Sequence, residues 1–302
     1  MMRRSVLGIA ALSGLVASAL PCEAGVAFTA LRDGLWQIIY QDSPSSAPKV
    51  VGGDLGADAS APALSPDGKR VAFEVAGQGI LVCPLAGGAC QPVKTGIGSA
   101  VRPAWDPKSG ELVFVRYTAS TSGEDSDILI TQNALQDIRP LVAHTGNQDE
   151  PRAVGEKAAV RRDVRFLAYS SGLVISLRQS GVRVVRQLWV MDLATGVPTL
   201  LVPGNHQDIH PDWSPDGQWL AFASDRGGEL EIWVVRPDGS GLRQVTSGPG
   251  SKTWPAWSPD GRKILYTRSA EGRQGLWLVG ADGSGAAPFG AGTEELRDAD
   301  WR

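Results

Sequence analysis

The segment Pro211-Asp212-Trp213-Ser214-Pro215-Asp216-Gly217 recurs along the chain and decides the predicted fold. A close copy, Pro255-Ala256-Trp257-Ser258-Pro259-Asp260-Gly261, follows 44 residues later, and related copies begin at Pro62 and Pro103. Pro fixes φ for the second position of a type I turn, Asp bonds the local backbone, and Gly takes the left-handed conformation. Because an apolar run such as Leu220-Ala221-Phe222-Ala223 comes next, each copy predicts a tight turn between two strands.

A second marker lies further along each repeat. Trp189, Trp233 and Trp277 recur with 44 residues between successive copies, and a Gly-rich turn such as Asp238-Gly239-Ser240-Gly241 follows. Each unit therefore contains four short antiparallel strands in about 40–45 residues, which is typical of a propeller blade. Such a blade cannot bury both of its faces alone, so the recurrent Trp and aliphatic residues are expected to pack against neighbouring blades.

The two chain ends complete one blade. Ala299-Asp300-Trp301 repeats the innermost strand, and Val26-Ala27-Phe28 resembles the strand that should follow it. The prediction is an all-β, six-bladed β-propeller with four-stranded antiparallel blades, closed by pairing of the C-terminal strand with the N-terminal blade. The expected blades span roughly residues 25–51 with 298–302, 62–95, 103–142, 151–202, 211–246 and 255–289.

Composition agrees with this interpretation and excludes some functions. The 302 residues include 37 Gly and 20 Pro, which disfavours a helix-rich fold. With 29 Lys and Arg against 32 Asp and Glu, the net charge of −3 excludes a polycation that coats nucleic acid, and we expect no nucleic-acid partner.

Residues 1–24 have the pattern of a cleaved export signal. Arg3-Arg4 precedes an apolar run from Val6 to Leu20, and small residues ending at Ala24 suggest cleavage before Gly25. A lipid anchor on Cys22 fits poorly because Pro21 precedes it, and the pattern does not decide between Sec and Tat export. No later segment is apolar enough to span a membrane, so we expect a periplasmic protein.

Together these motifs resemble the TolB-type propeller repeat, a relative of the WD repeat. The resemblance covers nearly all of residues 25–302, which we expect to form a single propeller domain without the α/β domain that precedes the propeller in TolB. It implies a non-catalytic module of the cell envelope that binds a protein or peptide, with a peptidoglycan-associated lipoprotein as one such partner. No Gly-x-Ser-x-Gly elbow exists for a peptidase, and we expect a monomer without a cofactor.

Propeller topology brings the first positions of the innermost strands to one mouth of the central channel. We predict that a partner binds there; the alternative is that these positions only start strands. Carboxylates near this mouth could alternatively hold Ca²⁺, although acidic residues also serve as turn formers. The predicted partner-binding residues are Arg102, Glu150, His210, Trp254 and Asp298, and Ala61 occupies the sixth position. The candidate Ca²⁺ ligands are Asp149, Glu150, Asp208, Asp212, Asp298 and Asp300.

The blade at 151–202 departs most from the repeat and is strongly basic. A predicted hairpin there carries Arg178, Arg183 and Arg186, and it could bind an acidic partner or an anionic polysaccharide, or simply be solvated. This leaves an alternative function as a propeller enzyme or carbohydrate-binding protein that acts on an anionic polysaccharide. The i, i+4 spacing of His206 and His210 would suit a metal site on a helix, but the flanking Pro and Gly residues indicate a loop.

After removal of residues 1–24, two cysteines remain. Aligning Cys83-Pro84 with Arg236-Pro237 places Cys90 opposite Arg243, so both cysteines fall at facing positions across the last hairpin of a blade. Facing residues of an antiparallel pair are close enough for a disulfide, and an exported protein meets oxidising conditions. We therefore predict a structural Cys83–Cys90 disulfide.

Overall fold

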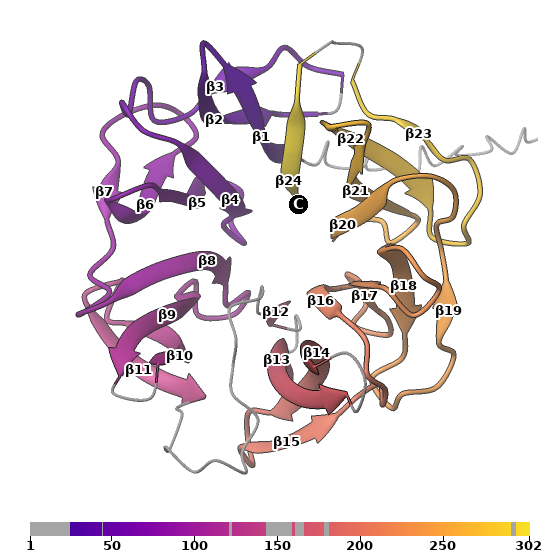
Figure 1. Cartoon of the computed structure of the whole chain (residues 1–302). Helices are drawn as coiled ribbons and strands as arrows, with labels where there is room; N and C mark the ends of the chain where they lie inside the picture. The colour runs from indigo at the N-terminus through magenta and orange to yellow at the C-terminus, as the bar shows by residue number, and fades with distance from the viewer. Residues whose placement is uncertain are drawn as a thin grey trace, which may run out of the picture.

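Six sheets stand in a ring in the structure of this chain, a computed structural model (Figure 1). It describes residues 25–43, 45–120, 123–142, 159–160, 166–177, 181–290 and 294–302, and these residues form strands and turns without a helix. Within them there is accordingly no helix that could cross a membrane. The predicted signal at residues 1–24 lies outside this part of the chain.

Each sheet has four antiparallel strands, which confirms the six-bladed propeller. From the centre of the ring outward, the first blade contains β24 (Leu296–Trp301), β1 (Val26–Arg32), β2 (Leu35–Gln41) and β3 (Lys49–Val50), and the second contains β4 (Ala59–Leu64), β5 (Arg70–Val75), β6 (Gly79–Pro84) and β7 (Gln91–Pro92). The third blade contains β8 (Ser99–Trp105), β9 (Leu112–Ser120), β10 (Gly123–Gln132) and β11 (Asp137–Val142), and the fourth contains β12 (Ala159–Val160), β13 (Phe166–Leu177), β14 (Gly181–Asp192) and β15 (Val197–Leu200). The fifth blade contains β16 (Asp208–Trp213), β17 (Leu220–Ser224), β18 (Glu231–Val235) and β19 (Arg243–Gln244), and the sixth contains β20 (Ser251–Trp257), β21 (Lys263–Ala270), β22 (Arg273–Gly280) and β23 (Ala287–Pro288).

The ring closes through the two ends of the chain, as predicted. β24 pairs antiparallel with β1, and the register aligns Val26 with Trp301 and Ala27 with Asp300. The Arg302 backbone N–H donates to the Gly25 carbonyl at 3.0 Å. The C-terminal strand thus becomes the innermost strand of the N-terminal blade and covers an edge that would otherwise be unpaired.

Neighbouring blades pack through the repeated apolar and Trp positions. One buried cluster combines Ala63 and Val82 of one blade with Trp105 and Phe114 of the next. The Trp105 indole N–H donates to the Ala63 carbonyl at 2.8 Å, across the boundary between the two blades. Trp at this position therefore fills the space between blades and also satisfies a buried carbonyl.

The Asp that precedes this Trp joins blades in a second way. The Asp212 carboxylate accepts the Trp257 backbone N–H at 3.0 Å, and the Asp300 carboxylate accepts the Leu64 backbone N–H at 2.7 Å. In both cases the donor belongs to the innermost strand of the following blade. The Pro-Asp-Trp part of the repeat therefore encodes contacts between blades.

The Ser-Pro-Asp-Gly turns have the predicted chemistry. In the turn at Ser258, the hydroxyl donates to the Asp260 carboxylate at 2.6 Å, and the Gly261 N–H donates to the Ser258 carbonyl at 2.8 Å. Gly261 has φ of +69°, a conformation that favours glycine. The Ser258 hydroxyl holds the pKa of Asp260 below its usual value. The turns at Ser65 and Ser214 repeat this arrangement.

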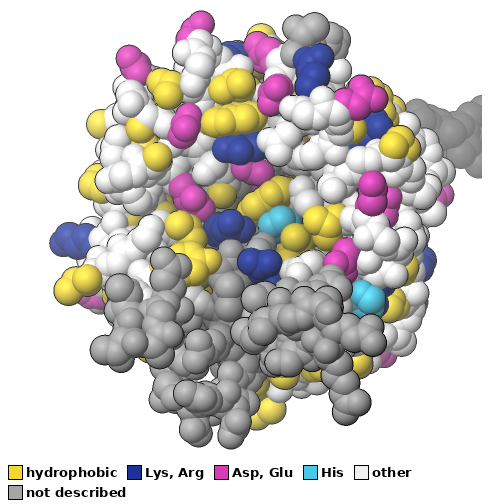
Figure 2. All heavy atoms as spheres, viewed as in Figure 1, with side chains coloured by type: hydrophobic (Ala, Val, Ile, Leu, Met, Phe, Trp, Pro, Cys, Tyr) yellow, Lys and Arg dark blue, Asp and Glu magenta, His cyan; other side chains and the backbone are white. Residues whose placement is uncertain are grey.

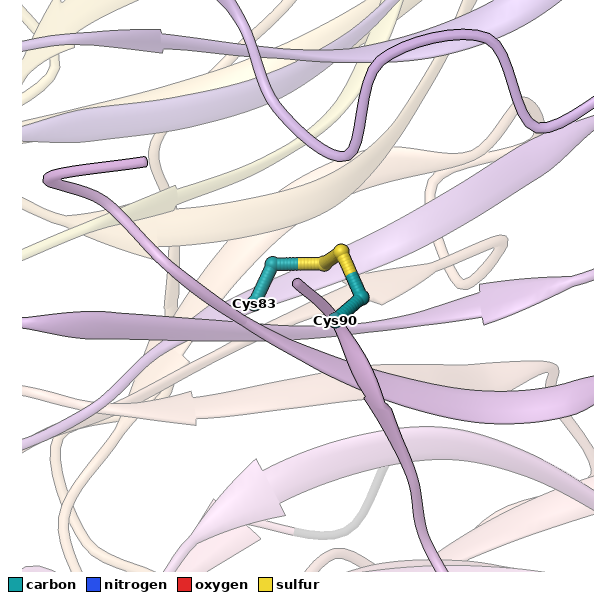
Figure 3. The surroundings of a disulfide bond; sticks show 2 residues. All are labelled: Cys83 and Cys90. Carbon is teal, nitrogen blue, oxygen red and sulfur yellow. A yellow bond between two sulfur atoms is a disulfide. The ribbon is translucent and has the colours of Figure 1, made fainter. Parts of the chain in front are cut away.

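The predicted disulfide is present. Cys83 lies in β6, and the pairing of Val82 with Gln91 in β7 brings Cys83 opposite Cys90. The two Cα atoms are 4.2 Å apart, and the sulfur atoms bridge the hairpin (Figure 3). The bond ties down an outer strand of only two residues, and the half-buried Cys90 packs against the core shared with the N-terminal blade.

Candidate functional site at the mouth of the ring

Each described innermost strand with a predicted site residue contains a β-bulge at that residue. At these bulges, five non-glycine residues have positive φ values: Ala61 (+50°), Arg102 (+56°), His210 (+56°), Trp254 (+55°) and Asp298 (+49°). Such values are uncommon for bulky residues and concentrate at functional sites. Glu150, the sixth predicted position, lies outside the described residues.

The bulges correct one detail of the sequence prediction. These residues do not start the innermost strands but lie inside them, because pairing continues on both sides of each bulge. In β16, Ile209 pairs with Ala223 before the bulge, and Asp212 pairs with Ala221 after it. The extra residue at the bulge re-aims His210 relative to the regular pleat.

Three of the predicted residues meet in one cluster, which we call the mouth cluster: Arg102, His210 and Trp254. The rings of His210 and Trp254 stack with centroids 3.8 Å apart and planes 17° from parallel. The Arg102 guanidinium lies over the Trp254 ring, 5.0 Å from its centroid. Because β8 and β20 stand on opposite sides of the ring, this contact reaches across its centre (Figure 1).

The members of the mouth cluster differ in exposure. His210 is only 6 % exposed, whereas Arg102 and Trp254 are half-buried. Figure 2 shows basic, histidine and hydrophobic side chains side by side at the centre of the visible face. His210 therefore supports the indole from within, and Arg102 and Trp254 offer a cationic and an aromatic surface to a ligand.

Two carboxylates complete the surroundings of the cluster. The Arg102 backbone N–H donates to the carboxylate of Glu74 in β5. Burial raises the pKa of Glu74, and the charge of Asp298 acts in the same direction, whereas the hydrogen bond and charge of Arg102 lower it. Asp298 is 8 % exposed, and its backbone N–H donates to the Thr267 hydroxyl at 3.0 Å.

Glu74 is a site residue that the sequence interpretation missed. It does not occupy an innermost strand, so the search for strand-start positions passed over it. The available signal was a single acidic residue within the otherwise apolar run Val71-Ala72-Phe73-Glu74-Val75. A charge within such a buried strand requires partners, and here they come from the neighbouring blade.

Among the candidate Ca²⁺ ligands that the structure describes, no three are placed to share a metal ion. Asp208 is fully buried and pairs with the Arg226 guanidinium at 2.7 Å, while Asp212 and Asp300 accept the blade-to-blade hydrogen bonds described above. Asp149 and Glu150 lie outside the described residues. Across the part of the chain that the structure describes, no group of three His, Cys, Asp or Glu residues is placed to hold a metal ion.

The second predicted site is a long hairpin. β13 and β14 pair continuously from Phe166 with Asp192 to Leu177 with Gly181, so the predicted extended hairpin is confirmed. Arg178 and the side chain of Arg183 lie outside the described part, whereas Arg186 is half-buried and donates to the Gln207 side chain at 3.2 Å. His206 lies within 3.5 Å of the Asp225 carboxylate, in a loop rather than a helix.

Comparison with known proteins identifies the family. The family model described as TolB beta propeller domain (PD40) matches residues 141–295, which is just over half of the chain. The chain belongs to the TolB β-propeller family. The Tol-Pal system protein TolB of Legionella pneumophila is 28 % identical over 145 residues, which cover 47 % of this chain and 32 % of that protein. This TolB-family chain covers a third or less of the length of the first curated relatives that it matches.

Solved structures share the propeller fold. TolB from Acinetobacter baumannii superimposes with a TM-score of 0.73 at 17 % identity, covering 93 % of this chain and 67 % of that one. Oligogalacturonate lyase from Vibrio parahaemolyticus has a TM-score of 0.53 at 15 % identity, covering 75 % of this chain and 63 % of that one. The TolB-like fold thus occurs in proteins with different functions, and the fold alone does not choose among them.

Proposed function

We propose that this TolB-family chain is an exported, periplasmic protein that binds an envelope protein or peptide at the mouth of its propeller and performs no catalysis. The mouth cluster carries this proposal. It combines a half-buried Trp254 with Arg102, and Trp and Arg are the residue types most enriched at binding hot spots. His210 holds the indole in place, so little side-chain freedom is lost when a partner binds.

The family supports the proposed class of partner. Relatives of this chain are Tol-Pal system proteins, and a peptidoglycan-associated lipoprotein is the partner we propose to test first. The aromatic and cationic surface suits an extended or looped segment that reaches the centre of the ring with an apolar residue. Asp298 and Glu74 stand beside this surface and favour a partner that also offers hydrogen-bond donors.

A binding experiment tests this function. The soluble domain of the peptidoglycan-associated lipoprotein from the same cell is titrated calorimetrically into the wild type and into Trp254→Ala and Arg102→Ala variants. Removal of a hot-spot Trp costs about 2 kcal/mol or more, which corresponds to a weakening of about 30-fold or more. The matched control is Trp219→Ala, because Trp219 is also half-buried but lies against the Ser-Pro-Asp-Gly turns at the opposite face. Equal affinities of wild type and Trp254→Ala for the partner would refute binding at the mouth of the propeller.

The basic hairpin favours one alternative, in which the propeller acts on or binds an anionic polysaccharide. Arg186 supports it from within the described residues, and Arg178 and Arg183 add charge by sequence. Turnover of uronic-acid polymers by the purified protein would support this alternative. If instead the polymer is neither cleaved nor bound, the polysaccharide function is rejected.

A further inference from the structure

A cavity of about 480 Å³ opens between the second and third blades in chain order, beside the mouth cluster. One wall is the β5–β6 turn with Gly77 and Gly79, and the other is the loop that enters β8 at Gly98. Ser60 and Glu74 line its inner end. We call this cavity the side groove.

The side groove is acidic. Asp58 and Glu74 line it, and none of its lining residues is Lys or Arg. The Arg102 guanidinium is turned to the Trp254 ring, while the Arg102 backbone N–H binds Glu74. The Arg116 guanidinium, which lies beside Gly96 of the β8-entry loop, pairs with the Asp127 carboxylate at 3.3 Å. A cationic group is therefore the ligand that the charge of this groove favours.

The walls of the groove suit a peptide backbone. A methyl group added at Gly77 or Gly79 would meet no atom within 4 Å, so open space lies above both residues. At Gly98, with φ of +116°, a side chain would collide with the Tyr117 carbonyl oxygen. Glycines that leave backbone uncovered allow another chain to approach closely. Ile97 adjoins the lining residue Gly98 on the same loop and is 90 % exposed, which offers an apolar contact beside the groove.

We propose that the side groove binds an extended segment of the protein partner and that a Lys or Arg side chain of this segment pairs with Glu74. This inference rests on the proposed function, since Glu74 borders both the groove and the mouth cluster. The segment would run from Ile97 beside the groove to Glu74 at the inner end, and its chain would continue to Trp254. A ligand cation would also compensate the burial that raises the pKa of Glu74, which the Arg102 N–H and the Ser60 hydroxyl offset only in part.

The test uses the purified protein and a positional-scanning library of capped hexapeptides. In the wild type, peptides with Lys or Arg at one position should bind at least tenfold more tightly than peptides with Gln there. Glu74→Gln keeps an oxygen for the Arg102 N–H and should abolish this preference, and Asp58→Asn should reduce it. Glu229→Gln is the matched control, because Glu229 is an exposed carboxylate of another blade. Thermal unfolding confirms that each variant is folded.

The outcomes separate this inference from the proposed function. The absence of a Lys or Arg preference in the wild type, or a preference that survives in Glu74→Gln, would refute the proposed binding at the side groove. Either result would leave the effect of Trp254→Ala on partner binding as an independent test of the mouth. A preference that Glu74→Gln abolishes would support the groove even if Trp254→Ala left partner affinity unchanged.

Discussion

Replacing Asp300 by Ala should destabilise the closed ring. The Asp300 carboxylate accepts the Leu64 backbone N–H at 2.7 Å, and its oxygen also lies 3.5 Å from the Arg302 guanidinium. Asp300 is 6 % exposed, so water cannot readily replace the lost acceptor. The Ala variant leaves the buried Leu64 N–H without this partner at the point where the C-terminal strand meets the next blade.

The size of the effect follows from the kind of bond. A hydrogen bond to a charged group contributes about 1.5–3 kcal/mol, and a buried donor left unsatisfied costs about 1–3 kcal/mol. We therefore expect Asp300→Ala to lower the free energy of unfolding by about 2–3 kcal/mol. Asp300→Asn retains an acceptor oxygen without the charge and should cost about 1 kcal/mol. Asp212→Ala, which removes the equivalent acceptor for the Trp257 N–H, should resemble Asp300→Ala.

Urea unfolding followed by Trp fluorescence measures these differences. Glu229→Ala is the control, since this exposed carboxylate should change stability by no more than about 0.5 kcal/mol. An Asp300→Ala variant that unfolds within about 0.5 kcal/mol of the wild type would refute the assignment of the repeated Asp to contacts between blades.

Three further changes test other parts of the structure. Replacing Cys83 and Cys90 by Ala opens a link between residues 7 apart in sequence and should cost about 2.5 kcal/mol by loop-closure entropy, so a loss below about 1 kcal/mol in urea unfolding would contradict it. Ser258→Ala should cost about 1 kcal/mol of folding stability at pH 7 and less at pH 3. The Ser258 hydroxyl lowers the pKa of Asp260 in the folded protein, and the resulting stabilisation is full at pH values above the pKa of unfolded Asp and is lost as the pH falls through the pKa of the folded protein. A cost that is equal at both pH values would count against this. Because burial raises the pKa of Glu74, the wild type should gain stability relative to Glu74→Gln as pH falls from 7 toward 4.5, and a pH-independent difference between the two would argue otherwise.

The fold was predictable because the residues that specify it lie close together in sequence and recur in successive blades. The Ser-Pro-Asp-Gly turns fix strand ends by Ser, Asp and Gly geometry, and Trp257 marks the innermost strand of its blade. Because Trp301 repeats the Trp of the innermost strands, the repeat pattern predicted that the C-terminal strand completes the N-terminal blade. The Cys83–Cys90 disulfide followed from aligning one blade with another.

The site was predictable only in part. Repeat alignment brought Arg102, His210 and Trp254 to one region, but their mutual contacts depend on side chains that meet across the ring. The bulges were missed because no residue type marks them: Ala61 and Trp254 both take a positive φ in the same position. Glu74 was missed because its partner, the Arg102 N–H, is a backbone group of another blade. Contacts between residues of different blades cannot be recognised from a sequence pattern within one repeat.

Photo-crosslinking in living cells tests the central claim, that a protein partner binds at the mouth of the ring. A photoreactive amino acid replaces Ser99, which is exposed at the start of β8 and lines the side groove beside the mouth cluster, or Asp238, which is exposed in the β18–β19 turn. The account predicts a crosslink from position 99 to one envelope protein, lost in a Trp254→Ala background and absent from position 238. Crosslinks from position 238 alone, or a position-99 crosslink that Trp254→Ala leaves unchanged, would contradict it.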